Sequence, residues 1–366
     1  MDRTSFYRII AGKEHRIAIE LAMPFLRLAS IFYSITIRAR NLCYDKGWLK
    51  QYQSATTVIC VGNITVGGTG KTPLVIWVTN FLTSKGLPCT ILTRGYKSPK
   101  GKFSDEPAVL AKSCPDAKVI IEPDRVAGAC RAVKQSDAKV IIMDDGFQHR
   151  RLARDLDIVA IDAICPLGYD RMLPAGLLRE PVSALLRADA AVITRSDQVS
   201  ELELENIERK LKQINPSITI AKAIHKPLCA KVLKTKEEPD KQKSAPEIGL
   251  EELREKSIFA FCGIGNPDAF MTTLRQLGLN VVASKIYDDH HRYAPADIDD
   301  IYEEARYLNV DIILTTEKDW TKTALMAGSK ENMPLAYLAV RLQFIEGEEQ
   351  ITRLIDNAIT QRTNTR

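Results

Sequence analysis

The chain has 366 residues, of which 45% are hydrophobic and 27% are charged, and its formal net charge is +5. This composition is typical of a folded protein, and the length predicts more than one domain. The weak positive charge, without dense basic clusters, argues against a nucleic-acid partner. The eight scattered cysteines include no Cys-x-x-Cys pair, which favours reduced thiols in the cytoplasm over a disulfide framework or a zinc site.

The first distinctive segment is the apolar stretch from Ile17 to Ile37, within the expected N-terminal segment 1–45. Glu20, Pro24 and Arg27 interrupt it, which argues against a membrane-spanning helix, and no signal peptide is recognisable. On a helix, one face would carry an apolar stripe made of Ile17, Leu21, Phe25, Leu28, Phe32 and Ile35. Together with flanking arginines at 16, 38 and 40, this pattern predicts an amphipathic helix that lies at a membrane surface. An ordinary helix packed on the core is the alternative interpretation.

A glycine-rich segment then follows the apolar run 57–61 and reads Gly62-Asn-Ile-Thr-Val-Gly-Gly-Thr-Gly-Lys-Thr72. A strand, such a turn and a helix beginning near Pro73 are the parts of a phosphate-binding loop, because the glycines allow successive backbone N–H groups to face one anion. The strict pattern requires glycine where this chain has Thr65, and Gly67 and Gly68 supply the flexibility instead. A plain glycine-rich turn is the alternative. The predicted nucleotide-binding residues are Thr65, Val66, Gly67, Gly68, Thr69, Gly70, Lys71 and Thr72.

Short apolar runs alternate with amphipathic stretches after this loop, and they predict strands at 89–93, 118–121, 139–143, 156–161 and 190–194. This alternation predicts an α/β fold with a parallel, phosphate-loop NTPase-like sheet, in which ligands collect at the carboxyl ends of the strands. One of these strands runs into Asp144-Asp145, and such an aspartate commonly holds the Mg²⁺ that the hydroxyl of Thr72 also contacts.

The composition changes between Lys231 and Glu255, where Lys, Glu, Pro and Ser dominate. We therefore predict a phosphate-loop core domain over 46–230, a linker or hairpin over 231–256, and a second, smaller α/β domain over 257–366. Strands are expected at 257–263, near Val281 and at 310–316, with a helix over 267–277.

Several motifs occur in a characteristic order along most of the chain. Besides the phosphate loop they are Thr93-Arg-Gly-Tyr96, Ser104-Asp-Glu-Pro107, Asp144-Asp-Gly-Phe-Gln-His-Arg150, Leu173-Pro-Ala-Gly-Leu-Leu-Arg-Glu-Pro181, Asp289-His-His-x-Tyr293 and Thr315-Thr-Glu-Lys-Asp319. Together they closely resemble the tetraacyldisaccharide 4′-kinases of Gram-negative lipid A biosynthesis. The resemblance implies transfer of the γ-phosphate of ATP, with Mg²⁺, to a tetraacylated glucosamine disaccharide 1-phosphate, which gives lipid IVA. It also implies that the enzyme acts at the cytoplasmic face of the inner membrane.

The resemblance also implies roles for individual residues. Asp105 and His290 correspond to a catalytic pair that removes the proton of the sugar hydroxyl, and we expect domain closure to assemble it. Metal ligands would be Thr72, Asp145 and Glu180, and residues near phosphate or substrate would be Tyr96, Arg125, Asp144, Gln148 and Arg179. Without the resemblance, the simpler interpretations are favoured: Asp105 as a helix cap and His290 as a surface histidine. Thr316–Asp319 receives no role.

Two rival functions use a phosphate loop as well. A membrane-associated ATPase switch would carry a signature lysine at the position of Val66. A GTP-binding regulatory protein would read its base with Asn/Thr-Lys-x-Asp, which Thr194-Arg-Ser-Asp197 imitates only in part. Rapid turnover that depends on a lipid acceptor would distinguish a kinase from both switches.

Overall fold

The computed structural model describes residues 17–95, 105–232, 246–289, 291–327 and 333–364. The chain divides into two compact units, Met1–His225 with Leu342–Arg366, and Lys226–Arg341. This division differs from the expected boundary, because residues 342–366 belong with the first unit. Helix α11 (Glu348–Asn364) accounts for the difference, since its Ile351 and Ile355 are fully buried in the core of the first unit.

The first unit is built on a parallel sheet in the order β7-β6-β5-β1-β4-β2-β3. Its strands are β1 (Thr57–Gly62), β2 (Cys89–Thr93), β3 (Lys118–Ile121), β4 (Val140–Asp144), β5 (Leu156–Asp162), β6 (Ala190–Thr194) and β7 (Thr219–Val232). The strands predicted from apolar runs are therefore confirmed within one or two residues. Side chains alternate between the two faces, so that Val58 and Cys60 enter one core while Ile59 and Val61 enter the other.

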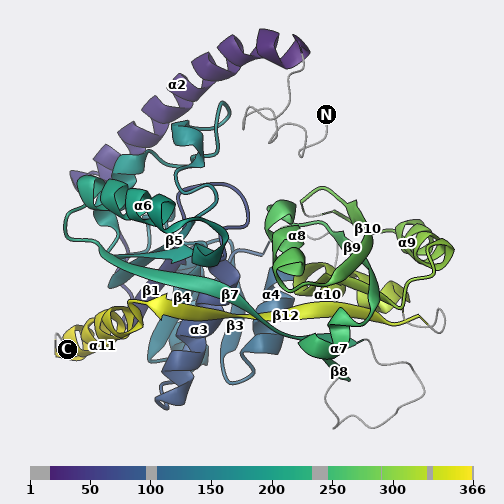
Figure 1. Ribbon diagram of the computed structural model, residues 1–366. Coiled ribbons are helices and arrows are strands. Elements are labelled where there is room, and N and C mark those ends of the chain that lie inside the picture. Colours follow the sequence, from purple (N-terminus) through teal and green to yellow (C-terminus); the bar gives the residue numbers. More distant parts are fainter. Residues whose placement is uncertain (1–16, 96–104, 233–245, 290, 328–332, 365–366) are drawn as a thin grey trace. The chain divides into compact units, whose positions relative to one another are not determined.

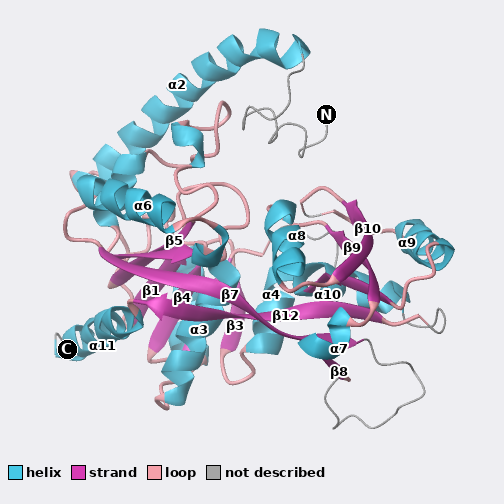
Figure 2. Cartoon of the chain, viewed as in Figure 1, coloured by secondary structure: helices cyan, strands magenta, loops and turns pink. Residues whose placement is uncertain are grey.

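Helices cover both faces of this sheet (Figures 1 and 2). One core includes residues of α3 (Lys71–Ser84), α4 (Asp105–Ser113) and α11, and the other includes residues of α5 (Arg125–Gln135), α6 (Glu201–Ile214) and the 3-10 turn η2 (Val182–Arg187). Two further 3-10 turns are η1 (Gly168–Asp170) and η3 (Ser196–Gln198). Local signals fix several helix starts: the Asp124 carboxylate accepts from the first turn of α5, and Ser200 with Glu203 forms a capping box on α6.

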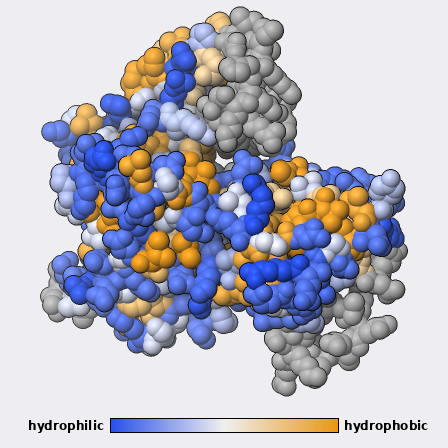
Figure 3. All heavy atoms as spheres, in the orientation of Figure 1, coloured by the Kyte–Doolittle hydropathy of each residue, from blue (hydrophilic) through white to orange (hydrophobic). Residues whose placement is uncertain are grey.

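Helix α2 (Ile17–Asp45) precedes the sheet, as predicted for an N-terminal amphipathic helix. Tyr33 and Ile37 pack against the core that contains α5 and α6, whereas Phe25, Leu28, Phe32 and Ile35 are more than half exposed. Apolar residues gather along the described part of this helix (Figure 3). Among the described helices, none is both long and apolar enough to cross a membrane.

The second unit is a smaller α/β unit in which β9 (Ser257–Cys262) pairs in parallel with both β10 (Asn280–Ile286) and β11 (Ile312–Thr316). β11 pairs in parallel with β12 (Leu335–Glu346), and β8 (Glu247–Gly249) pairs antiparallel with β7. Its helices are α7 (Leu250–Arg254), α8 (Pro267–Gln276), α9 (Pro295–Tyr307) and α10 (Glu317–Ala327). The predicted hairpin region thus contains β8, while residues 233–245 lie outside the described part of the chain.

Candidate functional site

The phosphate loop connects β1 to α3, as the sequence predicts. Gly70 precedes the first helical residue, Lys71, with φ +80°, a conformation that side-chain-bearing residues rarely adopt. A Cβ atom on Gly70 would also lie 2.7 Å from Nε2 of His225. Gly62 is constrained from the other side, because its Cβ would lie 2.6 Å from that of Phe147. The loop therefore requires glycine at its two ends for conformational and steric reasons.

Polar contacts brace the loop from within and from the end of β6. The Asn63 side-chain amide donates to the Thr65 carbonyl at 2.8 Å and to the Thr69 hydroxyl at 3.0 Å. The Thr194 hydroxyl donates to the Thr69 carbonyl at 2.9 Å, and the Arg195 guanidinium donates to the Gly68 carbonyl. These contacts use carbonyls and side chains, and so they fix the loop while its remaining N–H groups stay available to an anion.

Asp145 forms the charged centre of the site. It follows β4 directly, and its carboxylate lies 2.9 Å from the Arg179 guanidinium and 3.4 Å from the Lys71 ammonium. Burial alone would raise the pKa of Asp145, but the charges of Lys71 and Arg179 outweigh it and hold this pKa well below its usual range. The structure thus brings together three residues that the sequence assigned separately to nucleotide, metal and phosphate.

The neighbouring predicted residues support this centre through their side chains, two of which donate to backbone carbonyls. Asp144 is buried, and its carboxylate accepts from the Thr93 hydroxyl at 3.0 Å. Arg125 begins α5, is almost fully buried, and donates to the carbonyls of Asp144 and Glu122. Gln148 donates to the Asn63 carbonyl at 2.6 Å. Arg125 and Gln148 therefore hold the acidic turn and the start of the phosphate loop in register.

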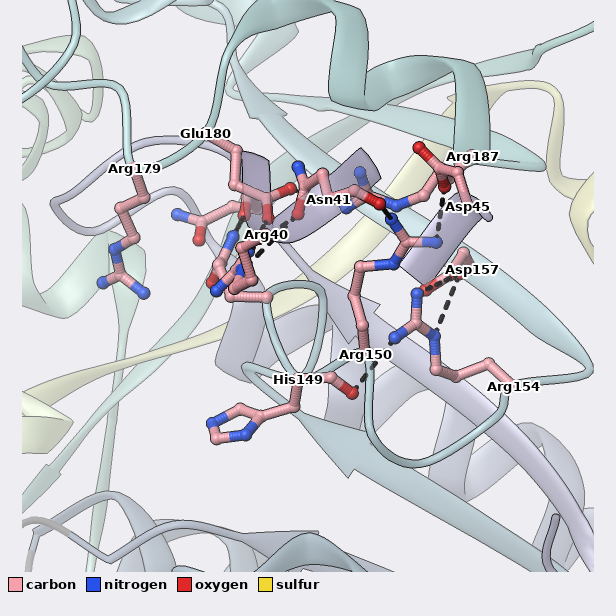
Figure 4. Close-up of polar contacts among 12 residues, drawn as sticks. Arg40, Asn41, Asp45, His149, Arg150, Arg154, Asp157, Arg179, Glu180 and Arg187 are labelled. Carbon is pink, nitrogen blue, oxygen red and sulfur yellow. Dashed lines mark hydrogen bonds and ion pairs between the residues drawn. The ribbon is translucent and has the colours of Figure 1, made fainter. Parts of the chain in front are cut away.

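Glu180 has contacts other than those expected of a metal ligand. It is fully buried, and its two carboxylate oxygens accept from Arg40 of α2 and from Arg187 of η2 (Figure 4). The Arg187 guanidinium lies 4.6 Å above the centre of the Phe147 ring, and the backbone and Cβ of Phe147 pack on Gly62. A magnesium role for Glu180 stays a prediction, and it would require the carboxylate to exchange one of these arginines for the ion.

Two histidines near the loop were not identified from the sequence. Nε2 of His225, the residue after which the chain enters the second unit, is sealed from solvent and has no hydrogen-bond partner in the described part of the chain. Burial and then the charge of Arg195 lower the pKa of His225 to about 3. Burial and then the charges of Arg125 and Arg94 lower the pKa of His149 to about 4. Both rings are neutral at neutral pH, so neither adds positive charge near the loop.

Three predicted residues have no side-chain description. Asp105 is the first residue of α4, Tyr96 lies in the segment 96–104 outside the described residues, and His290 is likewise outside them. The catalytic pair therefore stays a prediction.

The Thr315–Asp319 motif forms the junction of β11 and α10 in the second unit. Asp319 is fully buried and accepts from the Gly263 amide at 2.9 Å and from the Thr316 hydroxyl at 2.7 Å. The Lys318 ammonium lies 3.3 Å from the Asp289 carboxylate, one residue before His290. The motif thus fixes the carboxyl ends of β9 and β11.

Comparisons with known proteins identify the family to which the chain belongs. The chain matches the tetraacyldisaccharide-1-P 4′-kinase family over residues 22–360. It is 35% identical to the tetraacyldisaccharide 4′-kinase of Chlorobaculum parvum, covering 90% of this chain and 92% of the relative, and 34% identical to that of Halothermothrix orenii, covering 86% of each. The crystal structure of LpxK from Aquifex aeolicus in complex with ATP superimposes with a TM-score of 0.65 at 30% identity, covering 93% of this chain and 99% of that one. The chain has a phosphate loop in which Lys71 faces Asp145, and it matches these proteins over nearly its whole length. It therefore belongs to the tetraacyldisaccharide-1-P 4′-kinase family.

Proposed function

We propose that this chain transfers the γ-phosphoryl group of ATP to the 4′-hydroxyl of a tetraacylated glucosamine disaccharide 1-phosphate, the step that forms lipid IVA. The observation that carries the proposal is the cluster of Lys71, Asp145 and Arg179 at the end of the phosphate loop. Phosphoryl transfer depends mainly on positioning and on compensation of charge on the phosphoryl oxygens. Without nucleotide, Lys71 and Arg179 both pair with the Asp145 carboxylate. When ATP binds, its phosphate oxygens can replace this carboxylate as the partner of the two cations.

Magnesium fits the donor set at this cluster. The described residues include no group of three or more His, Cys, Asp or Glu that would hold a metal ion by themselves. Mg²⁺ in kinases is usually bound by one or two protein oxygens together with nucleotide phosphates and water. Thr72, which follows Lys71, and Asp145 offer a hydroxyl and a carboxylate of this kind. When bound, the ion would neutralise charge on the β- and γ-phosphates.

Asp105 and His290 are proposed as the pair that takes the proton of the attacking hydroxyl. A sugar hydroxyl is a weak nucleophile at neutral pH, and a carboxylate next to an imidazole is a suitable acceptor for its proton. This assignment is supported by the match of both residues to family motifs.

The exposed stripe of α2 is proposed to bring the enzyme to the cytoplasmic face of the inner membrane. A substrate with four acyl chains does not leave the bilayer readily, because each buried CH₂ group contributes about 0.8 kcal/mol to its retention. Phe25, Leu28, Phe32 and Ile35 present apolar area at a suitable surface, and Arg27 and Arg38 add attraction to anionic lipid.

The test is the conversion of tetraacyldisaccharide 1-phosphate with ATP and Mg²⁺ in mixed detergent micelles, with the position of the new phosphate determined by NMR. We expect a 4′-phosphorylated product and ATP consumption that depends on the acceptor. Lys71→Ala should reduce kcat by roughly 100-fold or more, because it removes a cation that compensates the charge of the transferring group. Acceptor-independent ATP or GTP turnover would contradict the proposal and favour a nucleotide-dependent switch.

A further inference from the structure

The segment from Met172 to Glu180 links α2 to the phosphate loop. On one edge it pairs with the residues that follow β1: the Arg179 amide donates to the Ile64 carbonyl at 2.7 Å, and the Val66 amide donates to the Leu177 carbonyl at 2.8 Å. Thr65 and Leu178 form an antiparallel bridge between these two hydrogen bonds. The backbone of the segment therefore moves with the start of the phosphate loop.

The same segment is held from its other side by the inner face of α2. The Ser30 hydroxyl donates to the Met172 carbonyl at 2.9 Å, and the Tyr33 hydroxyl donates to the Arg179 carbonyl at 3.0 Å. About two turns further along α2 than Tyr33, Arg40 donates to the buried carboxylate of Glu180 (Figure 4). These donors lie among the exposed apolar residues of α2 in the sequence but face the opposite way, toward the protein.

The geometry points to Tyr33 and Arg40 as positioning residues for phosphoryl transfer, which act through the backbone of Arg179 and the carboxylate of Glu180 to hold the Arg179 guanidinium against Asp145. The inference rests on the proposed function and extends it, because it gives α2 a second task beside membrane attachment. The Arg179 carbonyl is held by α2, its amide by the phosphate loop, and its side chain by Asp145. A residue fixed at three points is pre-organised for the charge that develops on the phosphoryl group.

The burial of Glu180 makes its ion pair with Arg40 costly to lose. Glu180 is fully buried, and a buried carboxylate that loses one of its two arginines is left with an uncompensated charge. Glu180 adjoins Arg179, so its displacement would move that residue as well. The segment would then keep its pairing with the phosphate loop only in a shifted position.

The test compares Tyr33→Phe with Tyr44→Phe in the full chain, with the acceptor in detergent micelles so that recruitment to a bilayer is not required. Tyr33→Phe deletes one hydroxyl, and we expect kcat to fall about three- to tenfold with the KM for the lipid acceptor unchanged. Tyr44 lies on the same helix, and its hydroxyl makes no hydrogen bond to the described residues, so its variant should match the wild type. Thermal unfolding of both variants shows whether the fold is retained.

A double-variant cycle identifies the route of the effect. In an Arg179→Lys background, Tyr33→Phe should have little further effect on kcat, because the residue through which it acts has been replaced. Arg40→Gln should lower kcat by more than Tyr33→Phe, and Arg40→Lys, which keeps the charge, should recover part of the loss. An undiminished Tyr33→Phe effect in the Arg179→Lys background, or no effect in the wild type, would overturn the inference.

Failure of the proposed function would be seen separately. If the wild-type protein does not phosphorylate the lipid, positioning is measured by calorimetry as the affinity for ATP with Mg²⁺. Tyr33→Phe should lower this affinity and Tyr44→Phe should not, and equal affinities would overturn the inference.

Discussion

Asp145 illustrates how a single residue connects the sequence motif to the chemistry. It has a φ of 51°, in the left-handed region that aspartate tolerates better than most residues with a side chain, and this turn directs it away from the buried strand that precedes it. Asp144 continues the strand and is buried, whereas Asp145 keeps partial access to solvent. Two adjacent identical residues therefore have different tasks, because the backbone changes direction between them.

The two neutral histidines predict a pH dependence of stability. An ordinary histidine has a pKa near 6.5, whereas His149 and His225 have pKa values lowered to about 4 and about 3 by burial first and then by arginine charges. Between pH 6.5 and these values the unfolded chain binds protons that the folded chain does not, so their stabilising contribution is complete above pH 6.5 and is lost as the pH falls. At pH 5 each histidine should lower the free energy of unfolding by about 2 kcal/mol relative to pH 7.

Urea unfolding at pH 7 and pH 5 measures this effect. The double variant His149→Gln, His225→Gln has polar side chains of similar size that do not titrate. Its free energy of unfolding should therefore fall less between the two pH values than that of the wild type. An equal fall in both proteins would show that other groups, such as the carboxylates, cause the acid sensitivity.

At the scale of single elements, α2 is the part of the chain whose surface is least like that of an ordinary soluble helix. Phe25 and Phe32 are 75% and 64% exposed, so charges at these positions should leave the fold intact. We expect Phe25→Glu with Phe32→Glu to weaken binding to anionic vesicles roughly tenfold or more, because it removes apolar area and adds repulsion. ATP affinity should stay unchanged.

The matched control is Tyr307→Glu, which introduces a charge at an aromatic residue of α9 that is 88% exposed. Vesicle co-sedimentation of the two variants separates a specific docking surface from a general effect of negative charge. Normal vesicle binding by the α2 variant would place the membrane contact elsewhere, and unfolding would show that the stripe stabilises the core.

Elements with a strong local signal were predictable from the sequence. The parallel strands are continuous apolar runs because both of their faces are buried, and the helix starts are given by local residues such as Pro267. β7 and β12 were not predicted, because polar residues interrupt them, such as Lys222 in β7 and Arg341 in β12. Lys222 is tolerated there because its ammonium lies within 3.0 Å of the carboxylates of both Glu208 and Glu346. Contacts of this kind connect distant parts of the chain and have no local pattern.

The candidate site divides in the same way. Lys71, Thr72 and Asp145 belong to contiguous motifs and were found from them. Three contacts join residues 85 to 155 positions apart: the packing of Phe147 on Gly62, the position of His225 beside Gly70, and the ion pair of Arg40 with Glu180. Such pairs depend on the tertiary placement of loops, and neither residue of a pair indicates the other in the sequence.

At the scale of the whole molecule, the chain passes twice between its two units. β7 begins in the first unit and ends in the second, and β12 returns the chain so that α11 completes the first core. The phosphate loop, its acidic centre and α2 all belong to the first unit, whereas Asp289 and the Thr315–Asp319 motif belong to the second. The residues proposed to take the proton, Asp105 and His290, are likewise divided between the two units by their positions in the sequence.

Because the two residues lie in different units, their joint action can be tested with single and double variants. If Asp105 and His290 act as one unit in removing the proton of the acceptor hydroxyl, Asp105→Ala and His290→Ala should each lower kcat by roughly 100-fold or more, with little change in the KM for ATP. The double variant should then be only slightly slower than the slower single variant, because removing either member already abolishes the shared function. Steady-state kinetics of the three variants with saturating lipid acceptor measure this, and ATP affinity by calorimetry serves as the control for intact nucleotide binding. Losses that multiply in the double variant would mean that the two residues contribute independently, and the proposed pair would have to be abandoned even if each residue proved important.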